Sequence, residues 1–385
     1  MENQIMISTF CLFLAKFIDM IRNLKSIILL LFILMSCANF LKASEDIAVS
    51  DTVASKKFNT GELIFGHIKD AYVWHITTIG QTPISIPLPV ILYSSRSGFH
   101  LFMSGKFHHG TEEFNGFKIA SEGKYQQKIV EVLSDGTEVR PWDFSITKNV
   151  TSLFISILIL LSVFLSVAKK YRQNINKAPN GLQGWMEPLV LFIRDDIAKP
   201  SIGNEKFERY LPYLLTIFFF IFINNLMGLI PFFPGGANLT GNITITLVLA
   251  LFTFVITSLS GSRNYWVHMV NDPGIPLWLK LPLPLMPIVE IMGVFIKPFV
   301  LTIRLFANIT AGHIVALGFY SLIFIFSEKS LLAGYGISVI SITFTVFMGI
   351  LELLVAFIQA YVFTLLSALY IGMALEKHES HAKES

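Results

Sequence analysis

The sequence predicts an all-α polytopic membrane protein with about five membrane-embedded helices, preceded by a small exported β-rich domain. Composition is the first observation behind this prediction. Of the 385 residues, 53% are hydrophobic and 13% aromatic, but only 14% are charged, whereas an average soluble domain has roughly 25% charged residues. With a mean hydropathy of +0.63, the chain has more apolar side chain than a single soluble core can bury.

The uneven distribution of charge is the second observation. Residues 45–148 contain ten Lys/Arg and twelve Asp/Glu, whereas residues 210–375 contain only nine charged residues. The first segment is therefore expected in water and the second in lipid. A net charge of +3 without a dense Lys/Arg run argues against nucleic-acid binding. The two cysteines, Cys11 and Cys37, are too few for a disulfide framework or a CxxC metal site, and no cofactor or metal is predicted.

Residues 1–44 have the layout of a secretory signal peptide. Basic residues at positions 22 and 25 precede the apolar run Ile27–Met35, and small or polar residues follow up to Ala43. Met20 would give a more ordinary basic segment than Met1, so it is an alternative start. Cys37 either ends the apolar region or belongs to a loose lipoprotein cleavage box, and both alternatives stand at this point.

Residues 45–148 are interpreted as an extracytoplasmic domain. Three segments rich in β-branched and aromatic residues lie between breaks of Gly, Pro and Ser: Ile84–Tyr93, Gly98–Ser104 and Lys128–Leu133. They predict a small β-rich module, whose role the sequence does not define.

The membrane domain is predicted over residues 149–375, and its first helix sets the topology. Val150–Ala168 is a run of 19 residues without a charge, enough for about 28 Å of helix and one crossing. Basic residues follow at positions 169, 170, 172 and 177, and the positive-inside rule assigns them to the cytoplasm. The preceding domain is then outside the cytoplasm, in agreement with the signal peptide.

The next segments alternate between the surface and the membrane. Trp185–Lys199 combines an apolar face with one Arg and two Asp residues, so it is predicted to lie on the cytoplasmic surface or to re-enter without crossing. Tyr210–Ile230 and Ile243–Leu259 are each long enough to span the bilayer.

The last two apolar stretches are unusually long. Pro287–Phe326 and Gly336–Leu375 are each 40 residues, which as helix is about 60 Å, twice the hydrocarbon thickness. Each stretch is either two spans or one inclined helix. Two long helices joined by a loop that starts at Glu328–Lys329 are the simpler prediction, because no basic cluster or Pro-Gly turn interrupts either stretch.

Three ionisable residues lie inside these stretches: Arg304, His313 and Glu352. Such a group at bilayer depth costs at least about 2.5–3.5 kcal/mol, so it usually lines a polar cavity, finds a partner or moves ions. One alternative is a buried Arg304–Glu352 salt bridge that locks two helices together. The other is an aqueous path, because Asn308 shares a helix face with Arg304, and Gln359 shares one with Glu352. Arg keeps its proton near neutral pH, whereas His and Glu titrate.

The segments around these charges resemble a known family. IKPFVLTIRLFANITAGHIV (296–315) and ILELLVAFIQAYVFTLLSALYIGMAL (350–375) are similar to the two signature helices of subunit a of F-type ATP synthases. PYLLTIFFFIFINNLMGLIPF (212–232) resembles an earlier helix of that family. The likeness covers roughly residues 140–375, and the long N-terminal extension departs from the compact family pattern. It implies that the two long stretches form a steeply tilted helical hairpin against the ring of c subunits.

The resemblance also implies roles for single residues. Arg304 matches the essential arginine of the family, which faces the proton-binding carboxylate of each passing c subunit. Asn308 and Gln359 match polar neighbours along the path. His313 and Glu352 match a titratable pair in the half-channel open to the side from which protons enter.

Glu290 matches an acidic position near the cytoplasmic half-channel. The implied function is the proton-translocating stator subunit of a rotary ATP synthase, without an ATP site on this chain. The implied partners are the c-ring, the b subunits of the peripheral stalk and the lipid bilayer. The implied location is the bacterial inner membrane, with the tail 376–385 in the cytoplasm. Whether H⁺ or Na⁺ is carried depends on the carboxylate of the c subunit.

Two other classes of protein are alternatives. An ion-coupled secondary transporter could bind an anionic substrate at Arg304, but it predicts inverted repeats, and the sequence has no such internal symmetry. An envelope interaction protein could use the helices only as anchors, but an anchor would not need Arg304, His313 and Glu352 at membrane depth.

Overall fold

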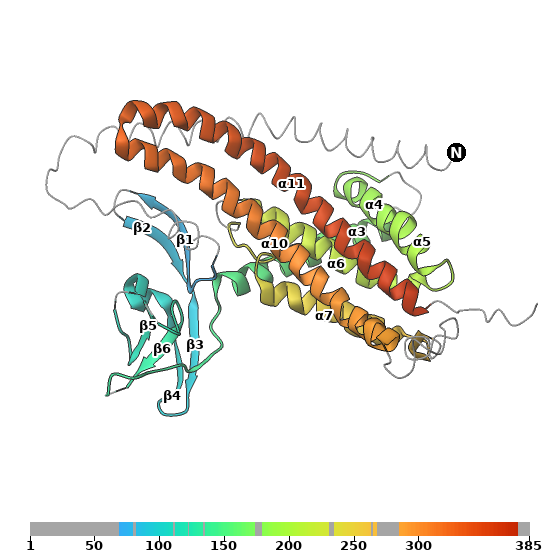
Figure 1. Ribbon diagram of the computed structural model, residues 1–385, viewed down its shortest axis with the longest axis horizontal. Helices are drawn as coiled ribbons and strands as arrows, with labels where there is room; N and C mark the ends of the chain where they lie inside the picture. Colours follow the sequence, from blue (N-terminus) through green and yellow to red (C-terminus); the bar gives the residue numbers. More distant parts are fainter. Residues whose placement is uncertain are drawn as a thin grey trace, which may run out of the picture. The chain divides into compact units, whose positions relative to one another are not determined.

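The computed structural model describes residues 69–79, 82–110, 112–121, 123–133, 135–173, 179–230, 235–262, 265–267 and 285–375. They form a small β module followed by a series of helices (Figure 1). The predicted signal peptide (1–44), which includes Cys37, and the predicted tail (376–385) lie outside the described residues.

The β module contains three small antiparallel sheets, which confirms the predicted strand-rich character of this region. The first is the hairpin of β1 (Val73–Ile79) and β2 (Thr82–Pro87). The second has the order β4-β3-β8, and the third the order β5-β6-β7. Their bounds are β3 Pro89–Ser94, β4 Gly98–Met103, β5 Phe117–Ile119, β6 Ile129–Val132, β7 Glu138–Val139 and β8 Trp142–Asp143, with the 3₁₀-helix η2 at Ser104–Gly110.

The predicted segment Ile84–Tyr93 is not one strand. It divides at the buried Leu88, because β2 pairs with β1, whereas β3 pairs with β4 and β8. The chain passes from one sheet to another at this residue because its two halves pair with different strands elsewhere in the sequence. Local β propensity does not reveal such pairing.

The module has its own apolar core and satisfied polar groups. The core consists of buried residues from several strands and loops: Tyr72, Val90, Leu92, Phe107, Phe117 and Ile129. The buried carboxylate of Glu131 accepts hydrogen bonds from Ser94 Oγ at 2.5 Å and Ser97 Oγ at 2.8 Å. The Tyr72 hydroxyl donates to Asp143, and burial together with this bond raises the pKa of Tyr72. Burial of these polar atoms is tolerated because each has a partner.

The first turn of α3 (Lys148–Gln173) is hydrogen-bonded to the module. Lys148 N donates to Ala71 O at 2.9 Å, and Asn149 N donates to Asp70 Oδ1 at 3.0 Å. The side chains of Lys148 and Asn149 are buried. The free N–H groups of this helix end therefore find acceptors in the module.

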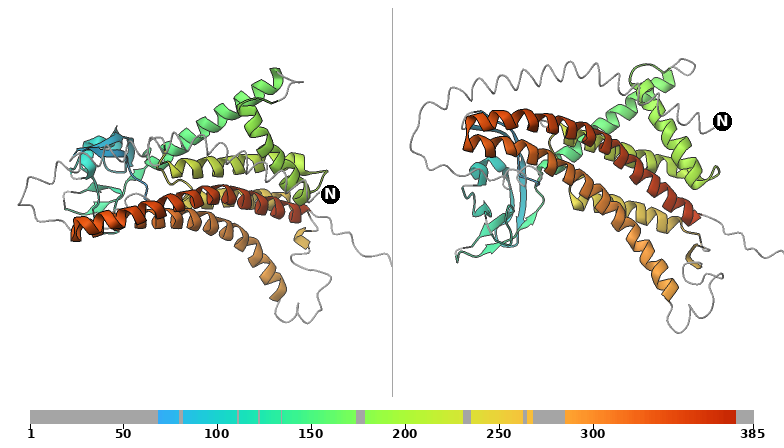
Figure 2. Two further views of the ribbon diagram at one scale, coloured as in Figure 1. Left: turned by 90° about the horizontal axis from the view of Figure 1, so that it is seen from above. Right: turned by 45° about the horizontal axis from the view of Figure 1, so that its top comes forward.

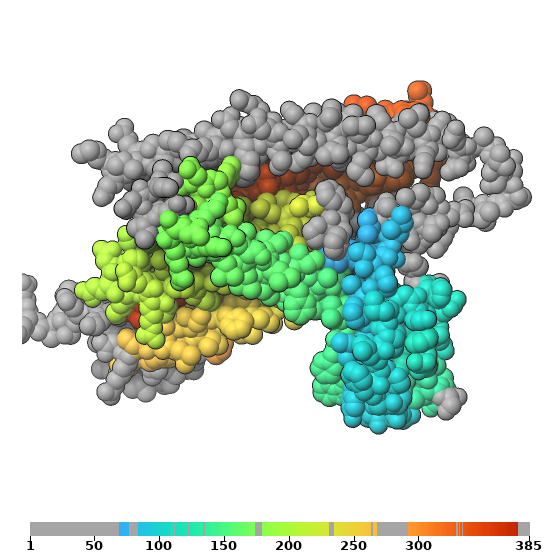
Figure 3. All heavy atoms as spheres, turned by 180° about the vertical axis from the view of Figure 1, so that it is seen from behind, coloured from blue at the N-terminus to red at the C-terminus, as the bar shows by residue number. Residues whose placement is uncertain are grey.

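Five of the described helices are long and apolar enough to cross a membrane, as predicted for a polytopic helical protein. Three of them follow the predicted segments within a few residues, because an uninterrupted apolar run sets their length. The spans are α3, α6 (Phe207–Leu229), α7 (Ile243–Ser260), Met292–Glu328 within α10 (Leu285–Lys329) and Gly334–Leu375 within α11 (Leu331–Leu375). α3 lies on the outside of the helices that it packs against, where Figure 3 shows it in green.

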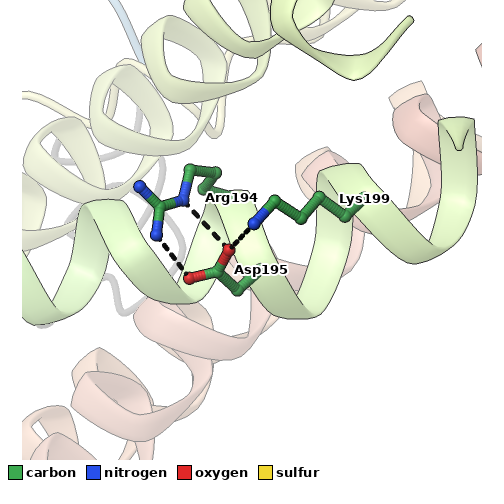
Figure 4. A network of polar contacts seen from close by, with 3 residues as sticks. All are labelled: Arg194, Asp195 and Lys199. Atoms are coloured by element: carbon green, nitrogen blue, oxygen red, sulfur yellow. Dashed lines mark hydrogen bonds and ion pairs between the residues drawn. The ribbon is translucent and has the colours of Figure 1, made fainter. Parts of the chain in front are cut away.

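The amphipathic segment after α3 is helical but is not among the five spans. It consists of α4 (Leu182–Phe192), a π-helical turn η3 (Ile193–Ala198) and α5 (Lys199–Ile202). In the π-helical turn, Asp195 accepts two hydrogen bonds from Arg194, at 2.8 and 3.0 Å, and one from Lys199 Nζ at 2.5 Å (Figure 4). The bonds from Arg194, followed by those from Lys199, lower the pKa of Asp195 to about 2.

The two longest helices form an antiparallel hairpin, as predicted, but its loop is shorter than predicted. Ser330 is the single residue between α10 and α11. Ser330 N donates to Phe326 O at 3.2 Å and Gly334 N to Ser330 O at 2.9 Å, so helical bonding continues across the turn. The helices run side by side from this turn and separate toward the start of α10 and the end of α11 (Figures 1 and 2).

The core of the helical part is centred on α6, which packs against α11. Its fully buried apolar side chains are Leu214, Phe218, Phe219 and Ile221. Small residues of α11 are buried in this part of the protein, among them Ala356, Ala360 and Ala368, and Ala356 O accepts a hydrogen bond from Asn225 of α6. A methyl group at Gly372 would overlap the backbone carbonyl of Ser201, so α5 approaches the backbone of α11 directly. Small residues of this kind allow close helix packing in membranes.

Candidate functional site

His313 on α10 and Glu352 on α11 meet across the helical hairpin. His313 Nδ1 and Glu352 Oε1 share a hydrogen bond, and only 16% of the His313 side chain and 8% of the Glu352 side chain are exposed. A carboxylate can only accept, so the bond requires a proton on His313 Nδ1 when Glu352 is ionised. A buried carboxylate and a partly buried imidazole thus lie in direct contact, an arrangement that can pass a proton from one to the other.

Two glycines leave room for this pair. A Cβ atom at Gly312 would lie 3.0 Å from Glu352 Oε1, closer than ordinary van der Waals contact. A Cβ atom at Gly228 on α6 would lie 3.7 Å from His313 Nε2. The carboxylate therefore reaches the backbone of α10, and the second ring nitrogen of His313 points toward α6.

Amide side chains of Asn residues lie near the His313–Glu352 pair. Asn225 Nδ2 on α6 donates to Ala356 O, one turn beyond Glu352, at 3.1 Å. The buried atoms Asn224 Oδ1, Asn225 Oδ1 and Asn238 Nδ2 have no hydrogen-bond partner among the described residues. Buried polar atoms of this kind usually bind ordered water. The His313–Glu352 pair thus borders a polar region that water can occupy.

Arg304 lies on another side of α10. Arg304 and Asn308 are exposed, whereas Leu301, three residues before Arg304, and Leu305, next to it, are buried. Arg304 and His313 are nine residues apart, which is two and a half helical turns, so they project from opposite sides of α10 about 13 Å apart along its axis. The exposed guanidinium therefore lies on a different side of α10 from the titratable pair, on the side where Lys297, two turns earlier, approaches Tyr370 of α11.

Two contacts fix the register of the hairpin. The first is the hydrogen bond between His313 and Glu352. The second is the contact of Lys297 Nζ with the Tyr370 ring, whose centre is 5.1 Å away. In two antiparallel helices with these contacts, the buried Gln359 lies level with the turn between Arg304 and Asn308. Gln359 is therefore within about one helical turn of the height of Arg304.

A second polar cluster lies on the other side of Arg304 along the helices. The hydroxyl groups of Tyr213 and Thr253 are 2.9 Å apart, and those of Thr253 and Ser367 are 3.2 Å apart. The cluster joins α6, α7 and α11. Next to it, a small cavity is lined by Thr253, Lys297 and Tyr370 together with residues of α7 and α10.

The structure distinguishes between the two interpretations of the buried charges. Glu352 pairs with His313, and no ion pair joins Glu352 to Arg304 among the described residues. A locking Arg304–Glu352 salt bridge is therefore not what holds this hairpin together. Glu290 lies in the second turn of α10, and its side chain is outside the described residues.

The polar residues of α6 and of the loop before α7 are not singled out by the sequence prediction. Asn224 and Asn225 lie inside an uncharged run of more than twenty residues. Two adjacent amides at membrane depth could therefore have indicated a functional site from the sequence. Asn238 lies in a Gly- and Asn-rich loop and resembles an ordinary turn residue in the sequence.

Comparison with known proteins identifies the family. A family model described as ATP synthase A chain matches residues 150–372, more than half of the chain. The chain belongs to the ATP synthase subunit a family. The match begins in α3 and ends in α11, so it includes the five spans and every candidate site residue described above.

Individual members of the subunit a family agree with this assignment. ATP synthase subunit a of Chloroherpeton thalassium is 45% identical over 254 residues, covering 64% of this chain and 72% of the relative. ATP synthase subunit a 2 of Chlorobaculum tepidum is 46% identical over 251 residues, covering 63% and 67%. ATP synthase subunit a of Myxococcus xanthus is 40% identical over 251 residues, covering 63% and 78%.

The β module has a separate match. A second family model, described as a domain of unknown function (DUF8433), matches residues 63–144. Its boundary with the subunit a match falls at the start of α3. The module is thus a recognisable unit joined to the subunit a domain.

Proposed function

We propose that this chain is the proton-translocating subunit a of a rotary ATP synthase, and that it supplies two half-channels and the arginine between them. Family membership supports the general function. The observation that carries the finer proposal is the buried His313–Glu352 pair on the opposite side of α10 from Arg304. The chain itself carries no ATP site in this proposal, since ATP is made elsewhere in the complex.

Protons enter along the side of α10 that carries His313. Water at Asn225 Oδ1 and Asn238 Nδ2, the atoms of these amides without a partner among the described residues, brings a proton to the His313–Glu352 pair. A proton received by one of the two groups is passed to the other through their shared hydrogen bond and then released toward the rotor. Gln359, level with the next turn of α10, continues the polar path toward Arg304.

Arg304 acts on the exposed side of α10, where the c-ring would pack. Val300, one turn before Arg304, and the adjacent Ile303 are exposed apolar side chains, as expected for a surface that meets lipid-facing helices. A c-ring carboxyl in lipid must be neutral, because a bare carboxylate there is too costly. Beside the permanent charge of Arg304 the carboxylate is stabilised, so it releases its proton at this point of the rotation.

The exit path is on the far side of Arg304. Lys297, Tyr370 and the hydroxyl cluster of Tyr213, Thr253 and Ser367 lie between Arg304 and the start of α10, where Glu290 is located. Arg304 does not relay protons at neutral pH, so it keeps the two paths from joining. A direct leak would waste about 2.3 kcal/mol per proton per 100 mV.

The proposal includes the partners and the topology. The partners are the c-ring, the b subunits of the peripheral stalk and the lipid of a bacterial inner membrane. Residues 1–44 act as a signal peptide, the β module is extracytoplasmic, and the tail 376–385 is cytoplasmic. The basic residues Lys169, Lys170 and Arg172 at the end of α3 support this orientation.

Replacing the arginine tests the proposal. In membranes that contain the complete complex, Arg304→Ala should abolish proton-coupled ATP synthesis, while the amount of assembled complex is unchanged. Arg209→Ala is the matched control, because Arg209 is also an exposed arginine, in the first turn of α6 rather than on α10. Coupled synthesis by Arg304→Ala at the rate of the Arg209→Ala complex would overturn the assignment.

A further inference from the structure

One face of the β4-β3-β8 sheet is apolar and uncovered. The pairing register aligns Phe99, Tyr93 and Trp142 in one row across the three strands. Phe99 is 66% exposed and Trp142 67%. These are large apolar side chains whose burial in a soluble domain would be strongly favourable.

The apolar row continues along the sheet. Leu101 pairs with Ile91, and Phe144 N donates to Ile91 O at 2.9 Å, so Leu101 and Phe144 form the next row with Ile91. Leu101 is 64% exposed and Phe144 63%. Successive side chains of a strand point to opposite faces, and the alternate residues Val90 and Leu92 are buried in the module core. The exposed rows therefore share one face, hereafter the aromatic face: Tyr93, Phe99, Leu101, Met103, Trp142 and Phe144.

The aromatic face is tied closely to a membrane helix. Phe144 precedes the first residue of α3 by four positions, so it lies within roughly 14 Å of the point where α3 begins. The bonds from Lys148 N to Ala71 O and from Asn149 N to Asp70 Oδ1 fix the first turn of α3 to the module. The module is therefore held at the end of a predicted span.

The composition of the aromatic face indicates what covers it. It contains Trp142, Tyr93 and other apolar residues, and none of its members is charged. Trp and Tyr are enriched where membrane proteins meet the headgroup region, because their rings have an apolar body and a polar edge. Apolar surfaces beside a membrane anchor gain free energy by entering the boundary between headgroups and acyl chains.

We propose that the aromatic face rests on the bilayer surface beside α3, with Trp142 and Phe144 among the headgroups and upper acyl chains. The module then has two attachments to the membrane, the helix α3 and the aromatic face. This inference goes beyond the proposed function and depends on neither Arg304 nor the His313–Glu352 pair. It requires only that α3 spans the membrane.

Photo-crosslinking in the intact complex tests this inference. A photoreactive benzoyl-phenylalanine replaces Phe99 or Leu101, one variant at a time, in full-length protein in its own membranes. Both positions are exposed, so the larger ring can be accommodated without disturbing the core. The matched references are Leu158, exposed on α3 within the span, and Glu113, an exposed residue of the module away from the aromatic face.

After irradiation, mass spectrometry identifies what each position has captured. The expected result is a lipid adduct at Phe99 and Leu101 that is several-fold more abundant than at Glu113 and comparable with that at Leu158. Adducts to a polypeptide, whether another subunit or a second copy of this chain, would show that a protein covers the face and would overturn the inference. Lipid adducts no more abundant than at Glu113 would also overturn it.

Discussion

A single methyl group at Gly312 would test the geometry of the His313–Glu352 pair. The Cβ of Gly312→Ala would lie 3.0 Å from Glu352 Oε1 and 3.3 Å from Glu352 Cδ, so the carboxylate must retreat by a few tenths of an ångström. Backbone atoms of α10 cannot move as easily, since helical hydrogen bonds on both sides hold them. The retreat lengthens the bond to His313.

The size of the effect follows from the bond that is weakened. A hydrogen bond to a charged group contributes about 1.5–3 kcal/mol, and partial loss of it corresponds to about 1–2 kcal/mol. At 1.36 kcal/mol per tenfold change in rate, proton conduction should slow roughly 5- to 30-fold. Helix stability should not fall, because Ala is favoured over Gly in a helix by about 1 kcal/mol.

Proton flux through inverted membrane vesicles, followed with a pH-sensitive dye, measures this change. Gly318→Ala is the matched control, because it makes the same substitution on the same helix, and nothing lies within 4 Å of the added methyl group. The reasoning is refuted if both variants conduct protons equally fast at equal amounts of assembled complex.

Three further predictions follow from the hairpin and the segment beside it. Exchanging His313 and Glu352 for each other should retain more proton conduction than either single change to Ala, because the pair and its shared bond persist; equal losses in all three variants would contradict a relay. Gly372→Ala should lower the amount of assembled complex, because the added methyl group overlaps the backbone carbonyl of Ser201. Gly349→Ala, which has open space around the added methyl group, should not lower it. Immunoblots of membranes measure the amount of complex in both variants. The pKa of Asp195 falls from 3.8 to about 2, so its contribution to stability is complete above pH 4 and is lost as pH falls toward 2. The amide protection factors in η3, which correct for the intrinsic pH dependence of exchange, should therefore fall only in that window, and a fall already between pH 7 and 5 would exclude this carboxylate as the cause.

The bounds of the membrane spans could be predicted closely, because a helix that crosses the bilayer needs an uninterrupted run of apolar residues of a certain length. α3, α6 and α7 begin and end within a few residues of the apolar runs, since any polar residue at depth is costly. For the same reason Arg304, His313 and Glu352 could be selected from sequence alone.

The face that each residue occupies was harder to predict. The buried Leu305 and the exposed Ile303 are both apolar, so the hydrophobic pattern does not separate the side of α10 that meets α11 from the side that meets lipid or another subunit. The nine-residue spacing of Arg304 and His313 does predict that they project from opposite sides of a helix. The contact of His313 with Glu352 shows that the His313 side of α10 meets α11.

The β module was predictable in character but not in connectivity. Strand-prone segments were visible, whereas β1, β5, β7 and β8 were not proposed, since several of them are only two or three residues long. Their pairing depends on partners far along the chain: β3 pairs with β8 about fifty residues later. Such long-range register is not encoded in local propensity.

The single-residue turn at Ser330 has a consequence for how this protein can evolve. With almost no loop to absorb a change in length, an insertion of one residue between His313 and Ser330 would turn the two ends of α10 about 100° relative to each other and shift them by about 1.5 Å. The His313 side of α10 would then no longer meet Glu352. Length changes in this half of the hairpin should therefore occur among related chains only as matched pairs, one in each helix at equal distance from Ser330.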